Sequence, residues 1–274
     1  MKETPTVSLL APSASAAAVW GITRWLLTAV AVLLVLHIVR LNTPRDMSPT
    51  TLRMVIDQFH FDREGNVPTW FSSTLMTVAA ALMIGIGVRA RRAGERSPRR
   101  WIAMGLIFVL LSLDESASFH EMLIHPLRER LNVSDIGFLH FTWVVPAMVL
   151  LAVLAVIYLP FLVALPRQVG VGLSAAATIY VFGAVGMEMF GGALASEDRR
   201  DSTTFAVTIT IEETLELLGL VLLLHTLMMY AFVRQTMPAL QSTPTPAWTA
   251  LSARGCVVER CDVEDMDAEA ATPL

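Results

Sequence analysis

Six apolar stretches, each long enough to cross a lipid bilayer as an α-helix, make up most of this 274-residue sequence. Hydrophobic residues account for 54% of the chain and charged residues for only 16%, whereas a typical soluble protein is about 25% charged. A helix needs about 20 predominantly apolar residues to span the hydrocarbon core. The predicted spans are 19–39, 69–88, 101–123, 139–164, 171–194 and 205–233. The sequence therefore predicts an all-α, polytopic membrane protein built as a bundle of six transmembrane helices.

The segments outside these spans are short, so no soluble domain of useful size is expected. Residues 1–18 form the predicted N-terminal tail, 19–236 the transmembrane domain, and 237–274 an acidic C-terminal tail whose Ser, Thr, Pro and Ala content is typical of disorder. Between the first two spans, Ser48-Pro49 is a typical helix start. Apolar residues follow at positions 52, 55, 56 and 59, a spacing that places them on one helical face. This pattern predicts a short amphipathic helix on the outer surface.

The orientation of the bundle follows from one arginine-dense loop. Six arginines lie within residues 89–100, between the second and third spans, and short loops rich in Lys and Arg stay in the cytoplasm. Because six spans is an even number, both chain termini are then predicted to be cytoplasmic. The expected location is the inner cell membrane, with the lipid bilayer as the main partner, and nothing in the sequence suggests nucleic-acid binding.

Seven carboxylates lie inside the third, fifth and sixth spans, which contain no Lys or Arg to balance them. They are Asp114, Glu115 and Glu121, then Glu188, then Glu212, Glu213 and Glu216. Charged side chains cost several kcal/mol in hydrocarbon, so such groups normally face the bundle interior or a water-filled cavity. With the predicted topology all seven lie in the outer third of the bilayer. We therefore expect one shared site.

Helical periodicity suggests which of these residues face one another. Asp114, Ser118, Glu121 and His125 are spaced i, i+4, i+7 and i+11, which on a straight helix gives one continuous polar stripe. Glu115 flanks this stripe and His120 points away from it. On the sixth span, Glu212 and Glu216 are one and two turns below the outer surface.

Carboxylate-rich sites bind hard or borderline cations, and imidazole ligands shift the preference toward Fe, Mn or Zn. The leading hypothesis is a divalent metal ion (Fe, Mn, Zn or Mg) in an enzyme that acts on a lipid or other amphiphile of the outer leaflet. The candidate metal ligands are Asp114, Glu121, Glu188, Glu212 and Glu216, with His120 or His125. Glu115 or Glu213, as an unliganded acid, would serve as the general base.

Two other functions compete with this hypothesis. Crowded carboxylates in a low dielectric also serve as proton relays, which would make the protein a proton-coupled or cation-coupled transporter. The acids could instead be neutral and hydrogen-bonded in a non-catalytic assembly protein. His225 lies too deep for the site and is expected to be a packing residue. Asp62, Glu64 and Asn66 alternate like the start of a calcium loop, but the later bidentate Glu is missing, so we expect a polar turn.

The topology yields a first test. A reporter fused after residue 236, or within 89–100, should register as cytoplasmic, because the arginine-dense loop anchors that side of the bundle. A reporter fused within 50–60 should register outside. The reverse pattern would place all seven carboxylates on the inner side of the membrane.

Overall fold

The regular structure of the described part of the chain is entirely helical, which confirms the all-α part of the predicted fold class. The structure is a computed structural model and describes residues 14–44, 51–95, 97–131 and 137–241. The Ser48-Pro49 helix start, most of the predicted N-terminal tail and residues 242–274 of the predicted C-terminal tail lie outside these ranges.

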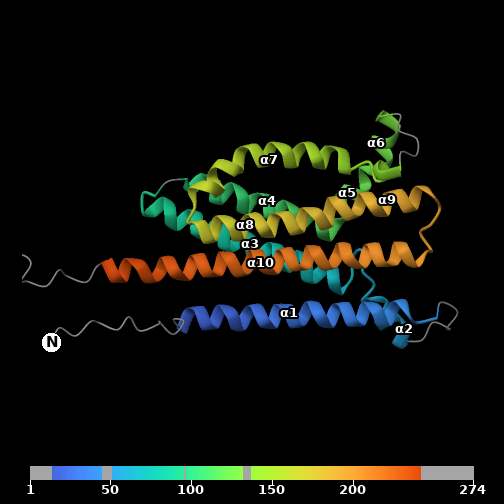
Figure 1. The fold of residues 1–274 in the computed structure, drawn as a ribbon, viewed down its shortest axis with the longest axis horizontal. Helices are drawn as coiled ribbons and strands as arrows, with labels where there is room; N and C mark the ends of the chain where they lie inside the picture. The colour runs from blue at the N-terminus through green and yellow to red at the C-terminus, as the bar shows by residue number, and fades with distance from the viewer. Residues whose placement is uncertain (1–13, 45–50, 96, 132–136, 242–274) are drawn as a thin grey trace, which may run out of the picture. The chain divides into compact units, whose positions relative to one another are not determined.

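The elements follow the predicted spans closely. They are α1 (Ala14–Leu41), α2 (Thr51–Asp57), α3 (Val67–Arg92), α4 (Pro98–Ala117), α5 (Phe119–Met122), α6 (Ile124–Leu131), η1 (Gly137–Leu139), α7 (Val144–Ala164), α8 (Arg167–Val181), η2 (Phe182–Met187), α9 (Glu188–Ser196) and α10 (Thr203–Gln241). Here η1 is a 3₁₀ turn and η2 is a π-helical segment. The long helices lie along one another, with α2, α5 and α6 at one end of the bundle and the start of α1 at the other (Figure 1).

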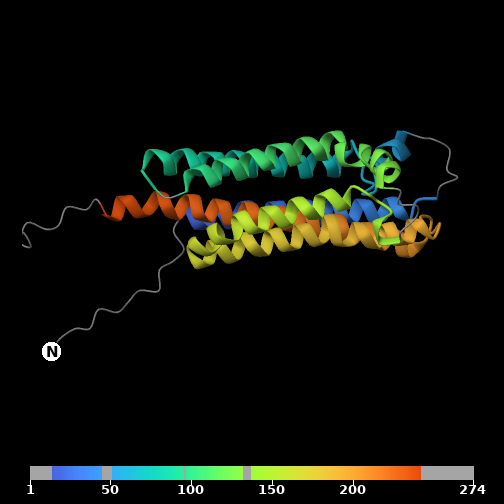
Figure 2. The same ribbon diagram turned by 90° about the horizontal axis from the view of Figure 1, so that it is seen from above.

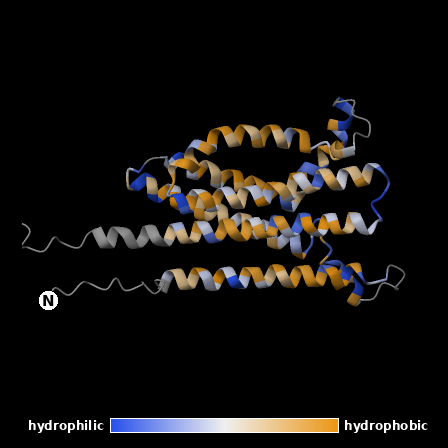
Figure 3. Ribbon diagram, viewed as in Figure 1, coloured by the Kyte–Doolittle hydropathy of each residue, from blue (hydrophilic) through white to orange (hydrophobic). Residues whose placement is uncertain are grey.

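Four helices are long and apolar enough to cross a membrane, namely Ser15–Leu41, Val67–Arg92, Val144–Ala164 and Arg167–Ser196. A fifth candidate is the bent pair formed by Pro98–Ala117 and Phe119–Arg130. Apolar residues dominate the long helices (Figure 3). The sixth predicted span forms a continuous helix in α10, but it is not among these candidates, so the count of six crossings stays a prediction.

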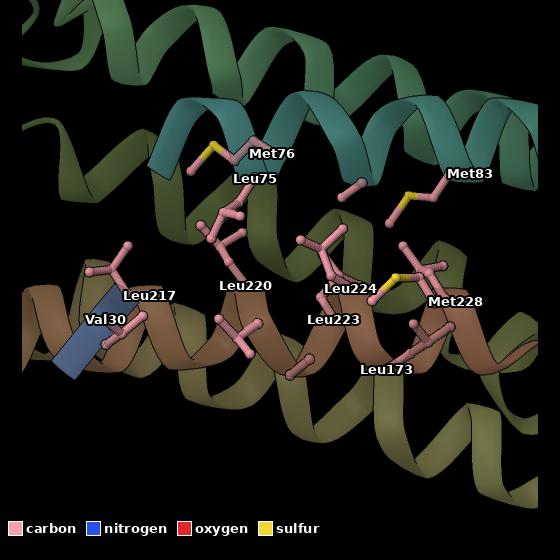
Figure 4. Packing of buried hydrophobic residues seen from close by; sticks show 14 of the residues in the cluster. Val30, Leu75, Met76, Met83, Leu173, Leu217, Leu220, Leu223, Leu224 and Met228 are labelled. Atoms are coloured by element: carbon pink, nitrogen blue, oxygen red, sulfur yellow. The ribbon is translucent and has the colours of Figure 1, made fainter. Parts of the chain in front are cut away.

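The apolar core lies between α10 and its neighbours. Leu217, Leu220 and Leu224 of α10 are each at most 2% exposed, and Leu220 points toward Leu75 of α3 (Figure 4). Lipid tails are as apolar as these side chains, so a membrane-embedded core gains its stability from close packing rather than from escape from water. In a membrane, precise interhelical fit would be the main requirement on such a core.

Glycine provides that fit where α3 meets α4. Figure 2 shows these two helices side by side along one side of the bundle. A Cβ atom added at Gly87 would lie 2.7 Å from Ile102 Cγ1, and one added at Gly105 would lie 2.6 Å from Ile84 Cγ1. Each helix thus presents a glycine to an isoleucine of the other, which allows the backbones to approach closely.

The segment between α1 and α3 confirms two sequence predictions. The expected short helix is α2, which is tied to α1 by an ion pair between Arg40 and Asp57. The expected polar turn leads into α3, where the Asn66 side chain caps the helix by accepting a hydrogen bond from the Thr69 backbone N–H at 3.1 Å. Residues 124–131, which lie between the third and fourth predicted spans, form the further helix α6.

The α3–α4 contact gives a matched pair of substitutions. Gly87→Ala should destabilise the folded protein by about 1–3 kcal/mol, because the new methyl group meets Ile102 and the Pro98 carbonyl oxygen. Gly85→Ala, in the same helix, meets nothing within 4 Å and should be neutral or stabilising by up to about 1 kcal/mol. Thermal unfolding in detergent measures both, and equal effects would contradict the packing described here.

Candidate functional site

A sharp break in the third predicted span shapes the acidic end of the bundle. The helix stops at Ala117, Ser118 adopts a left-handed conformation with φ 54°, and the chain turns by 70° into α5 and α6. The predicted continuous stripe from Asp114 to His125 is therefore wrong, because it assumed one straight helix. Glu121 and His125 lie beyond the bend instead of on the same face as Asp114.

Asp114 stabilises this corner with both carboxylate oxygens. Oδ1 accepts a hydrogen bond from the backbone N–H of His120 at 2.9 Å, and Oδ2 lies 2.9 Å from His120 Nδ1. The expectation that His120 points away from Asp114 is wrong for the same reason as the stripe. With Nδ1 engaged by a carboxylate, Nε2 is the ring nitrogen left for a further ligand.

Two carboxylates approach His120. The ligand atoms of Glu64, His120 and Glu121 lie within 4.8 Å of one another, and we call these residues the outer triad. Ligands at about 2.0–2.2 Å from a shared ion are at most about 4.4 Å apart, so small side-chain rotations would suffice to bind one. The sequence-based list of ligands missed Glu64, although the alternation of Asp62, Glu64 and Asn66 was the available signal.

The pKa values of Asp62 and Glu64, in the loop before α3, depend on burial and on the charged groups around the outer triad. Partial desolvation raises the pKa of Glu64, negative Glu121 and Asp114 act in the same direction, and His120 opposes them. Partial desolvation likewise raises the pKa of Asp62, with Arg200 as the main opposing charge. Both loop carboxylates therefore hold protons more readily than a carboxylate free in water.

A second group of carboxyls lies next to the outer triad. The indole N–H of Trp143 donates a hydrogen bond to Glu188 Oε1 at 3.1 Å, and Glu188 is an electrostatic neighbour of the Glu212 carboxyl. Glu212 is only 7% exposed, and its Oε2 atom is buried with no hydrogen-bond partner. The Trp143 ring also packs against the His120 ring, with centroids 4.9 Å apart, so this tryptophan joins the two groups.

A third group continues along α10. Glu213 has Glu115 and Glu64 among its electrostatic neighbours, and the carboxyl of Glu216 hydrogen-bonds with the Tyr180 hydroxyl. Glycine allows the close approach of these helices here as well. A Cβ atom added at Gly183 would lie 2.9 Å from the Glu212 backbone oxygen, and one at Gly219 would lie 2.9 Å from the Tyr180 backbone nitrogen.

Three of the other imidazoles either have hydrogen-bond partners or lie outside the outer triad. His225 lies 2.8 Å from the Thr23 hydroxyl, which agrees with its predicted packing role. His37 is buried, accepts a hydrogen bond from the Phe61 backbone N–H at 3.1 Å, and contacts Thr210. His125 is exposed and is not part of the outer triad. Metal ligation by Asp114, Glu188, Glu212, Glu216 or His125 stays a prediction.

These observations define the class of protein: an all-helical chain, with helices apolar enough to span a membrane, that gathers carboxylates and an imidazole at one end. The family model described as Domain of unknown function (DUF8692) matches residues 25–231, and the chain belongs to this family. The matched range includes the whole outer triad and its neighbours. No curated protein and no solved structure matched the chain.

The left-handed residue at the corner provides a test of the site geometry. Ser118→Val should destabilise the protein by at least about 1–2 kcal/mol, because a β-branched side chain is strained in this conformation. Ser118→Asn should be tolerated, since Asn adopts it readily. Ser116→Val, at an exposed position of α4, is the control and should change the melting temperature little. A tolerated valine at 118 would show that the helix does not break there.

Proposed function

We propose that this protein is a membrane protein that binds a divalent metal ion through Glu64, His120 and Glu121. The observation that carries the proposal is the Asp114–His120 contact beside two carboxylates. Metal-binding histidines usually donate their second ring N–H to a carboxylate, which fixes the tautomer and raises the basicity of the ligating nitrogen. Asp114 thus takes the role of a positioning residue.

The side chains of the outer triad are ligands of the kind that a catalytic metal ion uses. Two carboxylate oxygens and one imidazole nitrogen suit Fe, Mn or Zn, and the carboxylates alone would suit Mg. Three protein ligands leave coordination positions for water or substrate, as catalytic sites do. Such an ion would supply Lewis-acid chemistry. Glu115 and Glu213 lie within electrostatic range of Glu64 in the triad. They are the proposed proton acceptors.

The surroundings of the triad favour an amphiphilic substrate. Phe119, Met122 and Leu123 flank His120 and Glu121 in the chain and are 48%, 64% and 47% exposed. A polar site bordered by exposed apolar side chains suits a molecule with a polar head and an apolar tail. We therefore propose a lipid or similar amphiphile, reached from the outer leaflet. The arginine-dense turn between α3 and α4 supports cytoplasmic termini in an inner membrane.

A second function is favoured by a separate observation. Glu188, Glu212, Glu213 and Glu216, with Tyr180, extend the polar groups from the outer triad along the helices. Intramembrane chains of acids serve as proton pathways in transporters. Proton or cation transport is therefore the alternative, and it predicts that protons rather than a metal neutralise the acids.

Elemental analysis of the purified protein in detergent tests the metal proposal. The protein should hold a divalent ion, and chelation should lower its melting temperature, because saturating ligand stabilises the folded state by about 4 kcal/mol at a thousandfold excess over Kd. His120→Ala and Glu64→Gln should abolish binding. Asp114→Asn should weaken affinity by about 10–100-fold while still binding at high metal concentration.

His225→Gln is the matched control, because it removes an imidazole that contacts Thr23 and lies outside the triad. It should retain the full metal content whatever its effect on stability. A protein without metal, whose melting temperature does not respond to chelator, would overturn the metal proposal and favour the transporter.

A further inference from the structure

One arginine lies inside the first predicted span without a polar partner for its side chain. Arg24 is exposed on α1, at about 7.5 Å along the helix from the start of the span at residue 19. No described residue forms an ion pair or a hydrogen bond with its guanidinium group. Ionised side chains are rare inside membrane spans and normally mark a binding site. The bilayer itself offers an anionic partner in the phosphate groups of its lipids.

Contacts with α10 fix the direction in which α1 faces. The Thr23 hydroxyl lies 2.8 Å from His225 Nδ1, and His37 Nε2 lies 3.1 Å from the Thr210 hydroxyl. Thr23 and His37 are both buried, whereas Trp25 is 77% exposed. Two consecutive residues of an α-helix point about 100° apart, so Arg24 lies between the face that packs on α10 and the face that is turned away from the bundle. In a membrane this second face contacts lipid.

Gly21 leaves open space next to the Arg24 side chain. Side chains of a helix lean toward its N-terminus and cover the preceding turn, so Arg24 projects toward Gly21. A Cβ atom added at Gly21 would meet nothing within 4 Å. A shallow groove of about 340 Å³ is lined here by Gly21, Arg24, Trp25 and Thr28. Guanidinium groups bind phosphate through paired hydrogen bonds, and exposed tryptophans such as Trp20 and Trp25 are typical of the headgroup level.

The same face of α1 continues as an apolar groove. This second groove, of about 250 Å³, is lined by Thr28, Ala31, Val32, Val35 and Leu36. Arg24 and Leu36 are about 18 Å apart along the helix, at 1.5 Å per residue, and half of the hydrocarbon core is about 15 Å thick. The two grooves share Thr28. They therefore follow the order of a phospholipid, with the charged end toward the membrane surface and the apolar end toward the bilayer centre.

We propose that α1 binds one phospholipid of the cytoplasmic leaflet, with the phosphate paired to Arg24 beside Gly21 and an acyl chain along the groove from Thr28 to Leu36. The site lies toward the end of the bundle where α1 begins, whereas α5, which carries His120 and Glu121, lies at the other end (Figure 1). It depends on neither the metal ion nor the reaction proposed for the outer triad. The bound lipid covers a face of α1 that the described part of the chain leaves open.

Native mass spectrometry of the full chain in detergent tests this site. The protein is incubated with phosphatidylglycerol, or with a diacylglycerol that has the same acyl chains but no phosphate. One phosphatidylglycerol should bind at least about tenfold more tightly than the diacylglycerol, because hydrogen bonds between charged groups contribute at least that factor. Arg24→Gln should remove this difference. Gly21→Leu should weaken phosphatidylglycerol binding, because the new side chain fills the space that the phosphate would occupy.

Both substitutions should leave the fold intact. Beyond the helix backbone, the only described hydrogen bond at Arg24 is the one that its carbonyl oxygen accepts from the Thr28 hydroxyl, and the space around Gly21 is open. The matched controls are Arg199→Gln, at an exposed arginine paired with Glu197, and Gly85→Leu, at a glycine of α3 with open space around it. Neither control should change phosphatidylglycerol binding.

Three outcomes would overturn the proposal. The first is equal binding of the two lipids by the parent protein, which would show that no phosphate is recognised. The second is unchanged phosphatidylglycerol binding in Arg24→Gln or in Gly21→Leu. The third is the loss of an oligomer in Arg24→Gln without a loss of lipid, because the partner of this arginine would then be a protein. The metal content of the parent has no influence on any of these results.

Discussion

The contact between Asp114 and His120 is the interaction on which the acidic end of the bundle depends. One carboxylate caps the backbone after the break at Ser118 and orients the imidazole. The break redirects the chain by 70° at the point where Glu121 and His120 approach Glu64 in the outer triad. Because a left-handed serine is unfavourable by itself, the hydrogen bonds of Asp114 must compensate for it. Asp114 therefore has a structural role at the break and a proposed functional role in orienting His120.

The second constraint is the absence of Lys and Arg within the three acid-bearing spans. Carboxylates in an apolar bundle need another source of neutralisation, and the two groups described here differ in their surroundings. The outer triad contains an imidazole and exposed carboxylates, which suit a metal ion. The Glu188–Glu212 group contains no imidazole, and its Glu212 side chain is buried. Trp143 contacts both groups.

Close helix packing makes both arrangements feasible. Membrane-embedded helices associate through packing and hydrogen bonds rather than through exclusion of water, so the distance between backbones decides which polar groups meet. Gly183 and Gly219 bring α8, η2 and α10 together beside the acids, while Gly87 and Gly105 do so for α3 and α4. The glycines therefore position the site without contributing any chemistry of their own.

The amino-acid sequence by itself determined the helices, the arginine-dense turn and the concentration of acids at one end, because apolar length and charge are local properties. It also indicated the polar turn at Asn66 and the packing role of His225. Only the tertiary structure decided that α4 bends at Ser118, since helical periodicity assumes a straight axis. It alone brought Glu64 and Trp143 to the acids, because their positions depend on how distant segments pack, and no spacing within one helix encodes that.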